Sequence, residues 1–370
     1  MNDNNIKYKT PFNVLKNNFL TKAERVRNNN TLKVSSNILT KGKRHPLIKS
    51  WKTQRRNRNE KPYNFLNRRH NLWENKGHSN FFNTKINMSK YTNILGSGGF
   101  GMIVSNTRGK DVVKLYYRQN SCKEMNAEYV SFLSAYNALE DYPYPQLTIP
   151  EPKKIDNRNI QFKNTKFLCG IEMKRVAPIP FMGGTNGLIH IILKEGYKPM
   201  MNKEVSKNYS NPISNSNPSR GFFATGTYIT SDILTRLTEE QRSGINSIDD
   251  IAFRMGYGFA ILVVVAELYP NDVEYCLGMV DSILNVVILD FGMAMPINYS
   301  IDTRRIADII LYGDKELEHS TGISNDLYFP DNDDPTFEAF IAGIAAVKSL
   351  IQDPKKNEIL DIIISVLVRG

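Results

Sequence analysis

Residues 91–128 read YTNILGSGGFGMIVSNTRGKDVVKLYYRQNSCKEMNAE, and the interpretation of the whole chain depends on this stretch. Three glycines, Gly96, Gly98 and Gly101, lie between two apolar runs. Glycine is required where the backbone approaches another group closely or takes a positive φ. A chain of phosphates is such a group. The pattern therefore predicts a strand, a tight turn and a second strand that can cover phosphates.

The residues after the glycines separate two kinds of phosphate-binding turn. A dinucleotide-binding turn requires a helix directly after the glycines. Here β-like runs at 102–105 and 111–117 follow instead, with a turn between them. This order favours a phosphate-covering hairpin followed by a strand that carries Lys114.

A helix is predicted directly after that strand. Apolar residues recur at spacings of three and four over residues 121–139, as in an amphipathic helix; they are Met125, Tyr129, Phe132, Leu133 and Tyr136. Glu128 lies within this helix, so an ion pair with Lys114 is feasible. Glu124, one turn earlier, is a competing partner.

The rest of the chain supplies further strands and a second acidic site. Strands are expected at 160–162 and 167–173, and an apolar core helix at 251–268 that Pro270 ends. An apolar strand then leads into Asp290-Phe291-Gly292. Two amphipathic helices, at 337–351 and 358–368, are expected to close the chain.

In this order the pieces resemble the eukaryotic-type protein kinase superfamily. Leu95-Gly96-x-Gly98-x-Phe100-Gly101-x-Ile103 looks like its glycine-rich loop, Val112-Val113-Lys114 like its lysine strand, and Glu128 like the glutamate of its helix αC. Asp290-Phe291-Gly292 resembles its metal-binding motif. The resemblance implies an ATP and Mg²⁺ site, in which Asp290 would be the metal ligand. The implied nucleotide-binding residues are Gly96, Ser97, Gly98, Gly99, Phe100, Gly101, Ile103, Lys114, Glu172 and Met173.

The resemblance is weakest at the catalytic loop. The family's spacing, counted back from Asp290, places the catalytic base at Asp272. Pro270, Asn271, Glu274 and Leu277 replace the usual His, Arg, Lys and Asn. Loss of the Asn removes a metal ligand, and loss of the Lys removes positive charge beside the transferred group. A rival placement uses Asp281 and Asn285, but it leaves Asn285 inside the strand before Asp290.

Residues 1–90 differ from the rest of the chain in charge. They carry 21 Lys and Arg against 4 Asp and Glu, whereas the whole chain has a net charge of +11. Aromatic residues are interleaved with the basic clusters; they are Trp51, Tyr63, Phe65, Trp73, Phe81 and Phe82. Basic groups and aromatic rings suit binding to nucleic acid. A solvated, disordered extension is the alternative interpretation.

Composition sets the remaining limits. The three cysteines, Cys122, Cys169 and Cys276, show no close pairing, so neither a disulfide framework nor a zinc site is indicated and a reducing interior is expected. The most apolar run, residues 259–268, is too short to span a bilayer. We therefore expect an intracellular protein, cytoplasmic or nuclear, without a membrane span.

These observations predict an α+β, two-lobed protein-kinase-like fold. A basic, mostly disordered arm (1–90) precedes a small β-rich lobe (91–177) and a larger helical lobe (178–370), with an expanded connection at 178–250. The expected activity is transfer of the ATP γ-phosphate to Ser or Thr hydroxyls of a protein substrate. In this interpretation Asp272, Lys114 and Glu128 are catalytic, and the arm places the enzyme on nucleic acid or nucleoprotein. Alternatives are a pseudokinase scaffold and a nucleic-acid-binding protein. The Asn- and Lys-rich composition is similar to that of kinases encoded by large DNA viruses, which implies an infected host cell or a virion.

Overall fold

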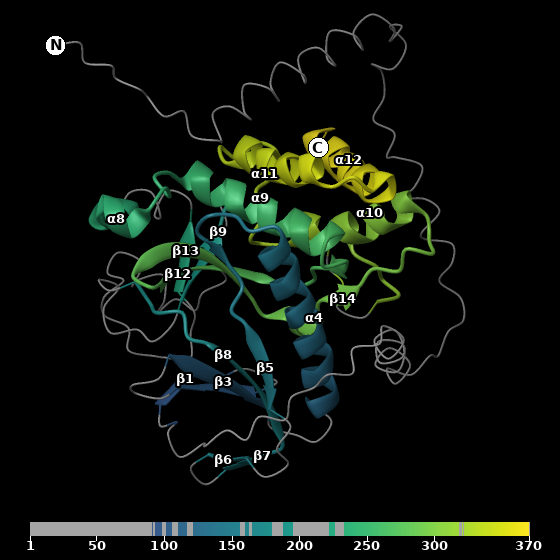
Figure 1. Cartoon of the computed structure of the whole chain (residues 1–370). Helices are drawn as coiled ribbons and strands as arrows, with labels where there is room; N and C mark the ends of the chain where they lie inside the picture. Colours follow the sequence, from purple (N-terminus) through teal and green to yellow (C-terminus); the bar gives the residue numbers. More distant parts are fainter. Residues whose placement is uncertain are drawn as a thin grey trace, which may run out of the picture. The chain divides into compact units, whose positions relative to one another are not determined.

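The computed structural model describes residues 91, 93–97, 101–105, 110–116, 121–155, 160–162, 165–179, 188–194, 222–225, 233–317, 320 and 322–369. All of them belong to one unit of the chain, Arg69–Gly370. The arm predicted at 1–90 and most of the expanded connection lie outside the described residues. The described part is α+β, as the sequence predicts (Figure 1).

The first sheet contains five antiparallel strands in the order β1-β2-β3-β8-β5. Its strands are β1 (Asn93–Ser97), β2 (Gly101–Ser105), β3 (Asp111–Tyr116), β5 (Pro152–Ile155) and β8 (Cys169–Lys174). A small hairpin of β6 (Ile160–Phe162) and β7 (Thr165–Phe167) contributes to the same core. Side chains alternate across β3, so Val113 and Leu115 enter that core while Lys114 faces the other way.

Helix α4 (Ser121–Asp141) connects β3 to the rest of the fold. It contacts β3, β5 and β8 of the first sheet and also helix α9 (Ile248–Val264) (Figure 1). The helix predicted at 121–139 is thus present and is two residues longer. Its position places one face of the helix against the strand that carries Lys114.

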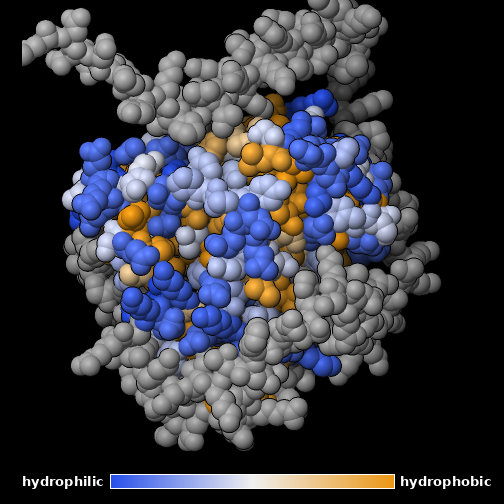
Figure 2. All heavy atoms as spheres, in the orientation of Figure 1, coloured by the Kyte–Doolittle hydropathy of each residue, from blue (hydrophilic) through white to orange (hydrophobic). Residues whose placement is uncertain are grey.

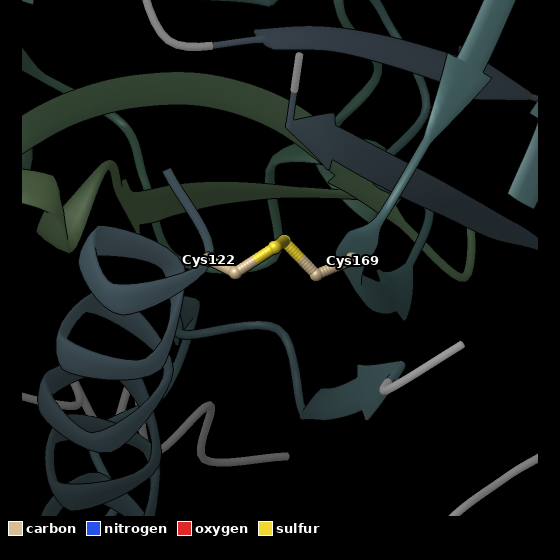
Figure 3. Close-up of a disulfide and its surroundings, with 2 residues drawn as sticks. All are labelled: Cys122 and Cys169. Atoms are coloured by element: carbon tan, nitrogen blue, oxygen red, sulfur yellow. A yellow bond between two sulfur atoms is a disulfide. The ribbon is translucent and has the colours of Figure 1, made fainter. Parts of the chain in front are cut away.

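A disulfide joins Cys122 in the first turn of α4 to Cys169 at the start of β8 (Figure 3). The expectation that no disulfide forms is therefore wrong for this pair, which are 47 residues apart in the sequence. Cys169 pairs with Tyr116, the last residue of β3, and α4 begins five residues later. Strand pairing, rather than sequence spacing, brings the two thiols together.

The second sheet has the order β10-β9-β12-β13-β4. Its strands are β4 (Leu147–Thr148), β9 (Ile189–Ile192), β10 (Phe222–Thr225), β12 (Glu274–Val280) and β13 (Ile283–Leu289). At its centre β12 and β13 form an antiparallel hairpin. A separate two-stranded ladder pairs β11 (Leu268–Tyr269) with β14 (Met295–Pro296). Because β11 precedes β12 and β14 follows β13, residues 270–273 and 290–294 lie at the same end of the hairpin.

The remaining helices are α7 (Leu234–Arg236), α8 (Glu239–Arg242), η3 (Phe291–Met293), α10 (Thr303–Tyr312), η4 (Ile323–Asn325), α11 (Phe337–Leu350) and α12 (Pro354–Arg369). Among them, α11 and α12 pack against α9, and α10 packs against α12. The core helix predicted at 251–268 is α9. It begins earlier than predicted, after a capping box formed by Ser247 and Asp250, and it ends earlier, at Val264. Gly256 of α9 and Gly343 of α11 let these two helices approach so closely that a Cβ on either would lie about 2 Å from the facing backbone.

One face of the described part is mostly polar. Figure 2 shows hydrophilic side chains over most of the coloured face, with smaller hydrophobic patches between them. Among the described residues, no helix has both the length and the hydrophobicity needed to cross a bilayer.

Candidate functional site

Three charged residues predicted from the sequence come together in space. Lys114 of β3 donates a hydrogen bond from Nζ to Oε1 of Glu128 on α4, at 2.7 Å. The same ammonium group lies 3.1 Å from Oδ1 of Asp290, which directly follows β13. Glu128 is thus the partner of Lys114, which decides between it and Glu124. Asp290 is 176 residues from Lys114 in the sequence, so this convergence depends on the tertiary fold.

Glu128 is held by both of its carboxylate oxygens. Tyr116 follows Lys114 by two residues on β3, so both side chains lie on the same face of the strand. Its hydroxyl donates a hydrogen bond to Oε2 of Glu128. The Glu128 carboxylate therefore has a fixed orientation in a buried setting. The two-residue spacing between Lys114 and Tyr116 is a signal in the sequence for this role of Tyr116, which was not predicted.

The electrostatic balance keeps Lys114 charged. Burial lowers the pKa of Lys114, but the carboxylates of Glu128 and Asp290 outweigh this effect and raise the pKa above its usual value. The side chains of Lys114 and Glu128 are 16% and 5% exposed, whereas that of Asp290 is 44% exposed. Asp290 thus has carboxylate surface available for a ligand while it also contacts the buried ammonium.

The residues after Asp290 anchor it to helix α4. Asp290 has φ of 54°, in the left-handed region, and the short helix η3 follows it. Phe291 is fully buried and stacks on Phe132 of α4, with ring centroids 4.9 Å apart. Ser131, next to Phe132, donates a hydrogen bond to the carbonyl oxygen of Ala294 at 3.0 Å. The segment that carries Asp290 and the helix that carries Glu128 are therefore packed as one piece.

The backbone of the glycine-rich hairpin is described only in part. Gly96 and Ser97 end β1, Gly101 and Ile103 lie in β2, and the tip formed by Gly98, Gly99 and Phe100 lies outside the described residues. Ile103 pairs with Lys114, which places the hairpin beside the lysine strand.

Gly101 also has a structural requirement that is independent of any ligand. A Cβ at this position would lie 2.0 Å from the carbonyl oxygen of Leu115 on β3. The sheet therefore requires a glycine here, whether or not a phosphate lies nearby.

Asp272 lies in the turn between β11 and β12, is exposed and has φ of 53°. The negative charge of Asp272 contributes to raised pKa values at both Glu274 and Asp326, which places it near these two carboxyls. Of the residues assigned to the catalytic loop, Glu274 and Leu277 belong to β12, which begins at Glu274. Leu277 is a buried strand residue that pairs with Val286.

The rival placement at Asp281 and Asn285 does not approach Asp290. Asp281 lies in the turn at the opposite end of the β12–β13 hairpin, and its side chain is 79% exposed. Asn285 is buried in β13, where its amide donates to the carbonyl oxygen of Ile283 and its oxygen accepts from Thr148.

Glu172 and Met173, which were predicted to contact the nucleotide, lie near the end of β8. The carboxylate of Glu172 is buried and accepts a hydrogen bond from the Tyr91 hydroxyl at 2.6 Å. Met173 is also buried and pairs with Val112 and Pro152. The Glu172 carboxylate, predicted to contact a nucleotide, therefore binds the Tyr91 hydroxyl.

The grouping of His190 with Glu274 and Cys276 near the start of β12 was not predicted from the sequence. Burial, together with Asp290 and Asp272, raises the pKa of Glu274 to about 8, although Lys114 acts in the opposite direction. Burial lowers the pKa of His190 to about 4. Two places in the described part could bind a cation. One is the half-exposed carboxylate of Asp290, which suits a hard ion such as Mg²⁺. The other is a group of donor atoms from His190, Glu274 and Cys276.

In comparisons with known proteins, no family model matches this chain and no curated protein matches its sequence.

Proposed function

We propose that this protein is an ATP-dependent protein kinase, directed at Ser or Thr hydroxyls, and a divergent member of the eukaryotic-type protein kinase superfamily. One observation carries the proposal. Lys114 lies between the buried carboxylate of Glu128 and the half-exposed carboxylate of Asp290, at 2.7 and 3.1 Å. An ammonium group fixed in this way can hold two phosphates of a nucleotide, and a carboxylate opposite it can hold the accompanying metal ion.

The proposed roles follow from the chemistry of phosphoryl transfer. Lys114 would hold the α- and β-phosphates, Glu128 would orient Lys114, and the β1–β2 hairpin would cover the phosphates. Mg²⁺, when bound at Asp290, supplies charge neutralisation at the β- and γ-phosphates. Asp272 would accept the proton of the substrate hydroxyl. The hydroxyl oxygen then bonds to the γ-phosphorus while the bond between the γ-phosphorus and ADP breaks.

The arrangement of elements supports a two-lobed, kinase-like architecture as part of this proposal. The first sheet together with α4 would form the small lobe, residues 91–177. The second sheet and the helices around α9 would form the larger lobe, residues 178–370. Asp290 and Asp272 come from neighbouring connections at one end of the β12–β13 hairpin, so both would face a nucleotide held by Lys114.

A pseudokinase scaffold is the second candidate, and the start of β12 favours it. Glu274 stands where the family has a lysine, and the buried Leu277 stands where it has the metal-binding asparagine. Both changes remove groups that stabilise charge on the transferred phosphoryl group. The protein would then bind nucleotide without turning it over.

The basic arm extends the proposal to partners and location. Residues 1–90 would direct the protein to nucleic acid or nucleoprotein inside a cell, a virus-infected cell or a virion, because their Lys and Arg residues neutralise phosphates. A nucleic-acid-binding protein that acts through this arm alone is the third candidate. Deletion of residues 1–90 should then abolish salt-sensitive DNA or RNA binding without changing nucleotide binding.

The test uses the purified full chain with Mg²⁺ and ATP labelled at the γ-phosphate. We expect phosphate incorporation into Ser or Thr of a protein substrate or of the chain itself. Lys114→Met, Asp290→Asn and Asp272→Asn should each reduce it by about 100-fold or more, which corresponds to about 2.7 kcal/mol of transition-state stabilisation. Glu124→Gln, on the same helix as Glu128 but outside the ion pair, is the matched control and should retain activity.

Two results would change the conclusion. Phosphate incorporation that survives both Lys114→Met and Asp272→Asn would contradict the assigned roles. Nucleotide binding that depends on Lys114 and Asp290, but without turnover, would favour the scaffold.

A further inference from the structure

Three potential metal ligands lie on one face of the second sheet. Glu274 and Cys276 are two residues apart on β12, so their side chains point to the same face. His190 of β9 pairs directly with Cys276 across the two strands. One nitrogen, one oxygen and one sulfur atom from these residues all lie within 4.8 Å of one another.

The spacing of these atoms fits a tetrahedral ion. Nδ1 of His190 is 3.7 Å from Sγ of Cys276 and 3.5 Å from Oε2 of Glu274. Zn²⁺ binds nitrogen, sulfur and carboxylate oxygen at about 2.0, 2.3 and 2.1 Å. In a tetrahedron, those bond lengths place nitrogen about 3.5 Å from sulfur and about 3.4 Å from oxygen, with sulfur about 3.6 Å from oxygen. The nitrogen–sulfur and nitrogen–oxygen distances therefore agree with those around a shared ion to within about 0.2 Å, and the sulfur and oxygen atoms lie within 4.8 Å of each other.

The surroundings allow an ion to enter from one side. Cys276 is fully buried, whereas the side chains of His190 and Glu274 are 17% and 30% exposed. The site thus has a closed sulfur end and an open carboxylate end. The Tyr328 hydroxyl lies 3.5 Å from Nδ1 of His190 and marks another wall of the site.

We propose that His190, Glu274 and Cys276 bind one Zn²⁺ ion, beside the Tyr328 hydroxyl. A cation between hard and soft, such as Zn²⁺, fits best, because the three ligands are a thiolate, an imidazole and a carboxylate. The two anionic ligands also balance the charge of a divalent ion.

Zn²⁺ at this position would crosslink β9 to β12 of the β12–β13 hairpin. The paired residues of β9 and β12 are Cys276 with His190 and Leu277 with Ile189, a short ladder. An ion that joins the two strands would reinforce this contact. Glu274 pairs with Leu289, the residue before Asp290, so the ion would lie beside the site of the proposed kinase activity.

The test uses Co²⁺ as a spectroscopic probe for Zn²⁺. The full chain, freed of metal by a chelator under non-reducing conditions, is titrated with Co²⁺. A cobalt–thiolate charge-transfer band can come only from Cys276, because the other two of the chain's three cysteines form the disulfide. We expect the band to saturate at one equivalent of Co²⁺ and to disappear when Zn²⁺ displaces it.

Variants separate this site from other histidines of the chain. Cys276→Ser should abolish the charge-transfer band, and His190→Gln and Glu274→Gln should each weaken Co²⁺ binding by about 10-fold or more. Zn²⁺ should raise the melting temperature of the wild type but not of Cys276→Ser, a conservative variant whose metal-free melting temperature serves as the folding control. A band that persists in Cys276→Ser, or wild-type protein that shows no band at millimolar Co²⁺, would overturn the proposal. These outcomes do not depend on whether the protein transfers phosphate.

Discussion

Phe132 of α4 stacks on Phe291, the residue after Asp290, with ring centroids 4.9 Å apart. Both rings are buried, and the hydrogen bond from Ser131 to Ala294 lies beside them. Glu128 lies one turn before Phe132 on the same helix. The stack therefore fixes the distance between the two carboxylates that flank Lys114.

Phe132→Ala should destabilise the protein strongly, because it removes a buried ring and leaves a cavity. We expect a loss of about 3–5 kcal/mol in the free energy of unfolding, measured by urea denaturation. Leu133→Ala, at the next and only half-buried position, is the control and should cost less. Equal costs at the two positions would show that the aromatic stack does not stabilise the site.

Glu128→Gln should destabilise the fold because it leaves the buried ammonium of Lys114 with only the half-exposed Asp290 as a counterion. We expect a loss of about 3 kcal/mol in the free energy of unfolding. Glu124→Gln should change it by less than about 0.5 kcal/mol. If the two variants unfold at the same urea concentration, the ion pair seen at 2.7 Å contributes nothing to stability.

Gly256→Ala and Gly258→Ala form a matched pair on α9. Alanine favours a helix over glycine by about 1 kcal/mol at both positions. At Gly256 the new Cβ would lie 2.0 Å from the Phe340 carbonyl oxygen, whereas at Gly258 it would meet Cδ1 of Ile288 at 2.7 Å, the movable end of a side chain. We expect Gly256→Ala to cost about 3 kcal/mol and Gly258→Ala to be nearly neutral. The reverse order in thermal denaturation would contradict the close packing of α9 against α11.

Reduction of the disulfide should lower stability. The disulfide closes a loop of 47 residues between Cys122 and Cys169. The lost entropy of the unfolded chain predicts that a disulfide closing a loop of this length stabilises the fold by about 4 kcal/mol. Dithiothreitol should lower the melting temperature of the wild type. The double variant Cys122→Ser/Cys169→Ser should melt at the lower temperature with or without reductant. A reductant effect that persists in the double variant would have to come from another source.

Asp326 should make stability depend on pH. Burial is the main factor that raises its pKa from 3.8 to about 6, and one of its oxygens accepts a hydrogen bond from the Tyr328 backbone at 2.9 Å. The folded protein therefore binds this proton more tightly than the unfolded chain does. The contribution of Asp326 to stability is then fully present below about pH 4 and is lost as the pH rises through about 6.

Asp326→Asn keeps the hydrogen-bond acceptor but cannot ionise. The variant should be more stable than the wild type by about 2 kcal/mol near pH 8, and the difference should shrink towards about pH 5. Urea denaturation at both pH values measures it. A constant difference across this range would show that Asp326 does not titrate with a raised pKa.

The sequence by itself determined the elements whose signals are local. The three- and four-residue spacing in 121–139 predicted α4, and the apolar run after residue 250 predicted α9. Lys114, Glu128 and Asp290 could each be singled out because they stand beside such runs in a particular order. The helix at Thr303–Tyr312, by contrast, was not predicted.

Only the tertiary structure decided which distant residues meet. The pairing of β8 with β3 joins Cys169 to Cys122, and the pairing of β9 with β12 places His190 beside Cys276. The tertiary structure also showed that Lys114 contacts Glu128 rather than Glu124, and that the Gly101 backbone lies against Leu115. Periodicity within one segment specifies which face of that segment is buried. Which segments become neighbours depends on how all of the buried faces pack together, and no local pattern in the chain encodes that.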